Sequence, residues 1–293
     1  MRVEPLSTYA ADQLSESRRA HHAAQSSQAE AEIAAMEAAA RAEHARSSKP
    51  LWRRALRVAS AEERAAQADQ QAAGQRAAVA ASQTELTTIR VSQRSKGERG
   101  EQALLAALAG ALSDDWMAFT GYQTKRGEAD LVLVGPDGVW VVEVKNRRVR
   151  LYVAGPDRWY VDKLSSSGRA QGQAEAHDAG GRVWGRQASE AAGALWRWLD
   201  RQGHAVPVRT AVVLMDDMAE VVLHGESGVD LVTARVPDLL VTIQVRSTPL
   251  AAAQCRAIES LIRRDHEHTM RKRAERAERA DRAERGDRAE RRG

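Results

Sequence analysis

Long stretches without large apolar side chains flank a central region that is rich in them. Residues 9–46 and 61–89 consist mostly of Ala, Gln, Glu, Arg and Ser and contain no proline, a composition that favours helix. Large apolar residues such as Leu14, Ile33 and Met36 are sparse in the first stretch, so a sustained heptad seam of large side chains is missing. This pattern predicts either a long exposed helix or a weak alanine-based coiled coil.

A basic amphipathic segment separates these two stretches. Residues 47–50 (SSKP) are a break, and residues 51–60 (LWRRALRVAS) combine bulky apolar side chains with three arginines. Such a segment can lie on a membrane surface. Its short length favours instead a helix that packs on its neighbour.

The central region alternates helical and extended patterns. Helices are predicted at residues 98–112 and 187–201, and a last helix is predicted to begin with Thr248 as its N-cap and Pro249 at its first position. A polar loop is predicted at residues 165–181. Strands are predicted at residues 129–134, 139–145, 150–153, 210–215, 220–223 and 229–233. Because helices and strands interleave, the predicted fold class is α/β.

The distribution of aromatic residues divides the chain into three parts. Only Tyr9 and Trp52 among the 7 Trp, 4 Tyr and 1 Phe lie outside residues 97–262, so a packed core belongs in that window. We therefore expect an Ala/Gln-rich helical arm at residues 1–94, a folded domain at 95–262 and a charged tail at 263–293.

The tail repeats an Ala-acid-Arg triplet, and acids of the repeat have an arginine four residues later, as Glu275 has Arg279 and Glu278 has Arg282. A fraying charged helix or a disordered segment is expected there, with His266 and His268 exposed to solvent. The tail contains 12 Lys and Arg against 8 Asp and Glu, which accounts for the whole net charge of +4. A charge-balanced remainder gives weak support to a general nucleic-acid-binding surface, although it leaves room for a local basic cleft.

Several classes of protein are excluded or disfavoured by what the sequence lacks. Cys255 is its single cysteine, which excludes an internal disulfide and a cysteine-cluster zinc site and suits a reducing cytoplasm. The first residues have no apolar signal region, and no apolar run approaches the ~20 residues that span a bilayer. No GxxxxGK[ST] loop is present, so an ATP-driven motor is not expected. We expect a cytoplasmic protein without a transmembrane segment.

Three charges occupy one apolar hairpin, GEADLVLVGPDGVWVVEVKN, at residues 127–146. The GPDG sequence is typical of a type I turn, and strand pairing outward from that turn places Asp130 opposite Glu143. Alternation along a strand puts Glu143 and Lys145 on the same face. Two carboxylates and one ammonium are therefore predicted to converge at the open end of the hairpin.

Two interpretations of these charges are open. One is a buried salt bridge that contributes little stability. The other is an oxygen-rich site for a divalent cation such as Mg²⁺, with Lys145 orienting or deprotonating water or stabilising charge that develops on phosphorus. A third acid, Glu101, falls at the centre of an apolar helical stripe with Leu105 and Leu108, where it needs a partner. A glutamate in a first helical turn favoured by the helix dipole is the alternative for Glu101.

The order Glu, then Gly-Glu-x-Asp, then Glu-x-Lys resembles the core of the PD-(D/E)XK nuclease superfamily, and more narrowly the nuclease-related domain called NERD. The resemblance covers residues 97–245 and includes GERGE, GEADLVLV, GVWVVEVKN, Trp159, GRQASEAAGAL and VPVRTAVVLM. It implies a restriction-endonuclease-like mixed sheet flanked by helices. The sequence VWGRQ departs from the family, which often has Asn-Pro shortly before its Gln, and the loop at 165–181 is longer than usual.

The resemblance also implies roles for single residues. It makes Glu101, Asp130 and Glu143 the acids of a Mg²⁺ or Mn²⁺ site, Lys145 the catalytic lysine and Gln187 an auxiliary active-site residue. The function expected from it is metal-dependent hydrolysis of DNA phosphodiester bonds, as by an endonuclease. The alternative is a catalytically silent module that binds nucleic acid or a protein partner, with self-association through the helical arm.

Overall fold

The computed structural model describes residues 1–48, 59–178, 180–245 and 249–290. It divides into two compact units, one formed by Ala11–Ser95 and the other by Met1–Ala10 together with Lys96–Gly293. We call them the helical unit and the sheet unit. Most of the predicted basic segment at residues 51–60 and the predicted N-cap Thr248 lie outside the described residues.

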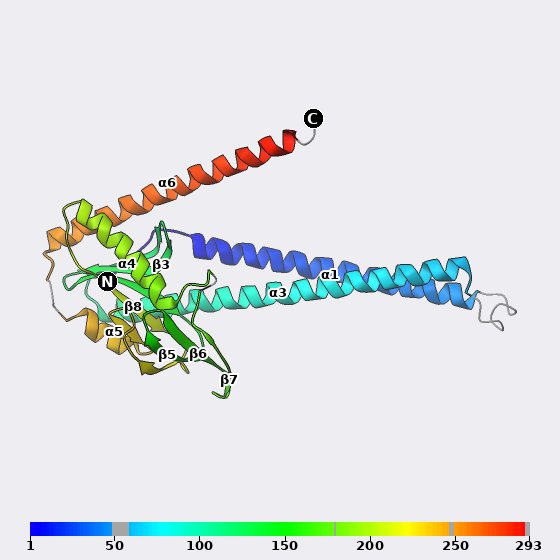
Figure 1. The fold of residues 1–293 in the computed structure, drawn as a ribbon, viewed down its shortest axis with the longest axis horizontal. Helices are drawn as coiled ribbons and strands as arrows, with labels where there is room; N and C mark the ends of the chain where they lie inside the picture. Colours follow the sequence, from blue (N-terminus) through cyan, green and yellow to red (C-terminus); the bar gives the residue numbers. More distant parts are fainter. Residues whose placement is uncertain (49–58, 179, 246–248, 291–293) are drawn as a thin grey trace. The chain divides into compact units, whose positions relative to one another are not determined.

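The helical unit pairs α1 (Tyr9–Ser47) with the first part of α3 (Ala61–Ala111) (Figure 1). Arg94 donates a hydrogen bond to the backbone carbonyl of Gln13 at 2.6 Å, and His21 Nδ1 lies 3.1 Å from Thr87 Oγ1. Early residues of α1 therefore meet late residues of this part of α3, so the two helices are antiparallel.

Small side chains fill the seam between these helices. Ala38, Ala42 and Ala45 are buried in α1 at spacings of four and three residues, and Ala73 and Ala80 are buried in α3 one heptad apart. Large residues such as Ile33 and Met36 are exposed instead. Buried alanines rather than large residues thus follow a heptad-like spacing along this seam, and a coiled coil stays a prediction.

The sheet unit contains one six-stranded mixed sheet in the order β1-β2-β3-β4-β8-β10. The pairs β1–β2, β4–β8 and β8–β10 are parallel, while β2–β3 and β3–β4 are antiparallel. The strands are β1 (Arg2–Pro5), β2 (Met117–Thr124), β3 (Gly127–Gly135), β4 (Gly138–Lys145), β8 (Val208–Leu214) and β10 (Leu231–Thr233). The α/β class and mixed central sheet expected from the sequence are confirmed.

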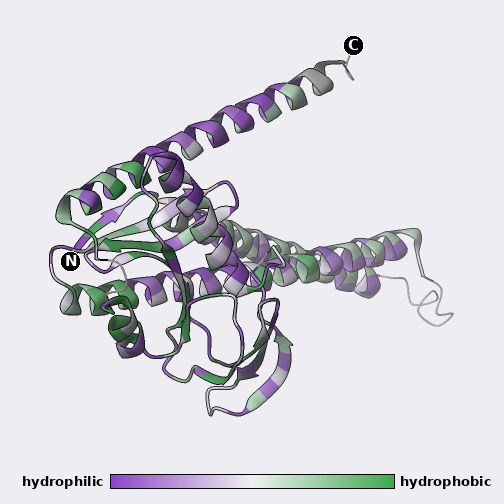
Figure 2. Cartoon of the chain, turned by 60° about the vertical axis from the view of Figure 1, so that its left-hand side comes forward, coloured by the Kyte–Doolittle hydropathy of each residue, from purple (hydrophilic) through white to green (hydrophobic). Residues whose placement is uncertain are grey.

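Helices cover both faces of this sheet. The end of α3 and α5 (Val236–Ile243) pack on the face that carries Leu131, Val142 and Val144. The opposite face packs against α4 (Trp184–Arg201) and α6 (Ala252–Glu290) (Figure 1). In Figure 2 the strands between these helices are largely hydrophobic, whereas the later part of α6 is largely hydrophilic.

A second sheet follows β4 in the chain. Its order is β7-β6-β5-β9, formed by β5 (Val149–Gly155), β6 (Arg158–Leu164), β7 (Ala170–Glu175) and β9 (Glu220–His224). Its apolar side chains, which include Trp159 of β6, share a core with Trp184 at the start of α4. This sheet therefore supports the beginning of α4.

Several elements differ from the expectations. Residues 165–181 are not one loop, because β7 lies within them as an exposed edge strand. The first residues belong to the sheet unit rather than to a helical arm at 1–94, since β1 pairs with β2. β1 is only four residues long and β7 has no large apolar side chain, so their sequences carry little strand signal.

The helix boundaries differ as well. α3 is continuous, so the predicted boundary at residues 94–95 falls inside a helix, and the last helix begins at Ala252 rather than at Pro249. The charged tail continues this helix to Glu290. His266 is buried rather than exposed, because that part of α6 packs on β2: the backbone N–H of Gln123 donates to His266 Nδ1 at 3.2 Å.

Candidate functional site

The β3–β4 hairpin has the pairing predicted from its turn. Gly135 faces Gly138, and the ladder runs outward to the pair Leu131 and Val142. Beyond that pair a side chain replaces the main-chain partner: the carboxylate of Asp130 accepts a hydrogen bond from the backbone N–H of Val144 at 2.7 Å. The hairpin therefore opens where the charged residues begin, and a strand backbone fixes the Asp130 side chain.

Glu143 and Lys145 form an ion pair at this open end. Lys145 Nζ donates to Glu143 Oε1, and the Glu143 side chain is only 1% exposed. The other carboxylate oxygen, Glu143 Oε2, is buried and has no hydrogen-bond partner among the described residues. An ion pair that served packing alone would be expected to satisfy both oxygens.

The electrostatics of this pair are unusual for a structural salt bridge. Burial raises the pKa of Glu143 well above its ordinary value, and the neighbouring Asp130 carboxylate raises it further. Burial opposes the charge of Lys145, but the carboxylates of Glu143 and Asp130 outweigh that effect and raise the pKa of Lys145. Negative charge is thus concentrated where solvent does not stabilise it, which is a favourable setting for a bound cation.

Glu101 approaches the same place from α3. Burial and the charges of Asp130 and Glu128 raise the pKa of Glu101 to about 8. Gly100 permits this approach, because a Cβ at its position would lie 2.6 Å from Cβ of Asn146, the residue after Lys145. Asn146 also donates to the Lys96 carbonyl at 2.8 Å, so the helix and the strand end are locked together.

Gln187 reaches the site from the first turn of α4. Its Oε1 accepts a hydrogen bond from Lys145 Nζ at 3.4 Å. The turn that carries Gln187 packs closely on the second sheet, since a Cβ on Gly185 would lie 2.5 Å from the Trp159 ring. The structure thus brings Gln187 to Lys145, and Trp159 supports the helical turn that carries Gln187.

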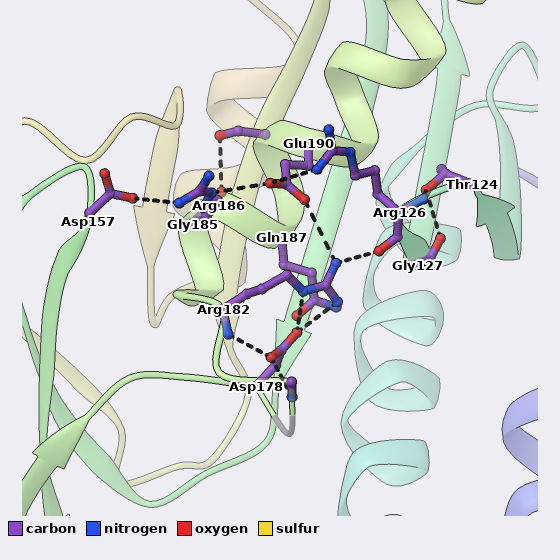
Figure 3. Close-up of polar contacts among 12 residues, drawn as sticks. Thr124, Arg126, Gly127, Asp157, Asp178, Arg182, Gly185, Arg186, Gln187 and Glu190 are labelled. Atoms are coloured by element: carbon purple, nitrogen blue, oxygen red, sulfur yellow. Dashed lines mark hydrogen bonds and ion pairs between the residues drawn. The ribbon is translucent and has the colours of Figure 1, made fainter.

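An ion-pair network joins the start of α4 to the β2–β3 turn (Figure 3). Arg182 binds Asp178 at 2.7 Å and donates to the backbone carbonyl of Arg126 in the turn. Glu190, one turn after Gln187, contacts Arg126 and Arg186 at 3.8 and 3.1 Å. This network holds Gln187 and the turn in a fixed relation.

Two residues near the site were not singled out from the sequence. Glu128 lies on the same face of β3 as Asp130, and burial and Asp130 raise its pKa; the Gly-Glu-x-Asp spacing contains the signal for it. Trp184 lies beneath Lys145, with Nζ 5.9 Å from the ring centroid. Its position depends on how α4 packs, and no local pattern reveals that.

The acids at this site offer the oxygen ligands that a hard divalent cation binds. Asp130 and Glu143 supply carboxylate oxygens, which such a cation prefers, and Glu143 Oε2 has no hydrogen-bond partner among the described residues. Among the described residues, however, no group of three or more His, Cys, Asp or Glu is placed to hold a metal ion. Asp130 and Glu143 are neighbouring acids, and Glu101 is close enough to interact electrostatically with Asp130.

Comparison with known proteins supports the resemblance found in the motifs. No curated protein and no solved structure matches the chain. No helix in the described part of the chain is long and apolar enough to cross a membrane. Residues 96–215, which include all five predicted site residues, match the family model of the nuclease-related domain, NERD.

Proposed function

We propose that the NERD domain hydrolyses phosphodiester bonds of DNA in a metal-dependent reaction at the open end of the β3–β4 hairpin. The observation that carries this proposal is the buried Glu143 carboxylate, which lies beside a second acid, Asp130, and whose Oε2 has no hydrogen-bond donor among the described residues. Leaving such an atom unsatisfied is costly unless a ligand completes it. DNA as the substrate rests on the family resemblance.

Asp130 and Glu143 would hold the metal ion, and Glu101 would supply a further carboxylate nearby. A bound Mg²⁺ or Mn²⁺ would acidify a water molecule and neutralise charge on the phosphate oxygens. The backbone N–H of Val144 fixes Asp130, so this ligand needs little reorganisation.

Lys145 would stabilise the negative charge that develops on the phosphate. Its ammonium has three N–H donors, of which Glu143 and Gln187 each accept one. The third is available for a phosphate oxygen or for the attacking water. Gln187 would act by keeping Lys145 in place, since Oε1 is an acceptor that carries no charge.

Plasmid cleavage by the full chain in Mg²⁺ or Mn²⁺ tests this function. Because Asp130→Ala removes a proposed metal ligand and Lys145→Ala a cation at the reacting phosphate, each is expected to reduce the rate by roughly 10²–10³-fold. Lys163→Ala, which removes an exposed lysine of β6, is the matched control and should cut normally. Cleavage that persists unchanged in both site variants would show that the assigned site is wrong.

A silent binding module is the second candidate. The lack of a preformed group of three ligands among the described residues favours it, as does the occupation of Glu143 Oε1 by Lys145. DNA that is retarded in a gel shift but never cut with any divalent metal would support this alternative. Self-association through the helical unit belongs to it and stays a prediction.

A further inference from the structure

Two cations from the end of β4 lie over one aromatic ring. Lys145 Nζ and Arg147 Cζ are each 5.9 Å from the centroid of the Trp184 ring, which is itself buried. The positive charge of Arg147 works against the net rise in the pKa of Lys145. Arg147 is therefore a close neighbour of the proposed catalytic lysine.

The two cations differ in how they are paired. Lys145 is engaged by Glu143 and Gln187. Arg147 is exposed, and among the described residues no carboxylate lies within ion-pair distance of its guanidinium. The next arginine, Arg148, contacts Asp216 at 3.5 Å.

An unpaired guanidinium in this position suits a phosphate. Arginine binds phosphate through two parallel N–H donors in a planar fork, and an aromatic face can hold that plane while the outer edge stays exposed. A carboxylate partner would compete with the phosphate, and none is present among the described neighbours of Arg147.

We propose that Arg147 binds a backbone phosphate of the nucleic-acid strand next to the one held at Lys145. This inference rests on the proposed function for its substrate. A contact of this kind is independent of base sequence, because it recognises only the phosphodiester backbone. Arg147 then positions the strand, while Lys145 and the acids act on the reacting phosphate.

Binding measured without cleavage tests this role separately from catalysis. The full chain is titrated into a fluorescein-labelled DNA duplex in EDTA, at several salt concentrations, and anisotropy gives the dissociation constant. We expect Arg147→Ala to weaken binding about tenfold, the range of one charge-assisted contact. The slope of log affinity against log salt should fall by about 0.9, the value for one lost phosphate contact with duplex DNA.

Two further variants provide the controls. Arg148→Ala removes the neighbouring arginine that is paired with Asp216, and it should leave both the affinity and the salt slope unchanged. Arg147→Lys keeps the charge and should restore the salt slope while recovering only part of the affinity. Unchanged melting temperatures would show that all three variants fold.

Two outcomes would overturn the inference. Equal weakening by Arg147→Ala and Arg148→Ala would mean that the region acts only through its general charge. Unchanged binding by Arg147→Ala, with a shifted pH profile of cleavage, would mean that Arg147 acts only on Lys145. A wild-type protein that binds DNA but never cuts it would refute the proposed hydrolysis and still leave the Arg147 contact measurable.

Discussion

Two buried glutamates of the sheet unit, Glu143 and Glu259, are held in opposite ways. Arg2 donates to Glu259 Oε1 at 2.7 Å and to its Oε2 at 3.4 Å, and Arg263 lies 3.8 Å from Oε2. Both oxygens of Glu259 are occupied by donors. Glu143 has one oxygen bound to Lys145 and a second with no partner among the described residues.

The difference separates a structural ion pair from a candidate site. Burial alone does not mark a functional carboxylate, because both side chains are almost inaccessible, at 1% and 4% exposure. What marks Glu143 is incomplete pairing beside a second acid, Asp130. Glu259 ties β1 to α6, whereas Glu143 lies beside Asp130 with one oxygen that no donor among the described residues completes.

The strongest test of this comparison is the same substitution at both positions. Glu143→Gln should reduce plasmid cleavage by roughly 10²–10³-fold. Its free energy of unfolding should change little, since the amide removes a charge that burial disfavours and can donate to Asp130, while its oxygen still accepts from Lys145, which offsets the loss of the ion pair. Plasmid cleavage and urea unfolding, followed by tryptophan fluorescence, measure the two effects.

Glu259→Gln should show the reverse pattern. It should cut normally but lose about 1–3 kcal/mol of unfolding free energy, because charge-assisted hydrogen bonds from Arg2 weaken. If Glu259→Gln abolished cleavage, or if Glu143→Gln unfolded the protein, the distinction between the two glutamates would be incorrect.

The open end of the hairpin was predictable where its geometry is local. The turn GPDG sets the pairing of β3 with β4, so the approach of Asp130 to Glu143 follows from a few neighbouring residues. Alternation then places Lys145 on the side of Glu143. These steps need no knowledge of the rest of the fold.

The parts that were missed depend on distant packing or on main-chain pairing. Trp184 lies beside Lys145 because the second sheet packs against the start of α4. The periodicity of the helix sequence does not predict which distant strands the helix will contact. The polar edge strand β7 lacks apolar alternation, and its pairing with β6 decides its conformation. The roles of Glu101 and Gln187 in a reaction stay predictions.

Gly100 in α3 offers a test of how the helix positions Glu101 at the site. Gly100→Ala places a Cβ 2.6 Å from Asn146 Cβ, so α3 or the end of β4 must shift and Glu101 moves with it. We expect a loss of about 1–3 kcal/mol in unfolding free energy and slower plasmid cleavage.

Gly110→Ala is the matched control in the same helix. Nothing lies within 4 Å of a Cβ at Gly110, so alanine should stabilise the protein by about 0.5–1 kcal/mol and leave cleavage unchanged. Equal effects of the two substitutions would show that close packing at Gly100 does not position Glu101.

The smallest expected effect concerns the contact of α6 with β2, where His266 should make the free energy of unfolding depend on pH. Burial lowers the pKa of His266, and Arg273 adds to this effect, while the Leu6 backbone, Asp265 and Glu267 oppose it. The folded protein therefore holds neutral His266, whose Nδ1 accepts the N–H of Gln123. In the unfolded chain this histidine takes up a proton near pH ~6.5.

Stability from His266 is thus complete above about pH 6.5 and decreases as the pH falls toward the lowered pKa of the folded state. Urea unfolding at successive pH values should show the free energy of unfolding decreasing over this range. Because asparagine keeps an acceptor for Gln123 but does not titrate, His266→Asn should remove this part of the pH dependence. His268→Asn, which alters the more exposed histidine beside Arg271, should keep it, and the same loss in both variants would assign the effect to another group.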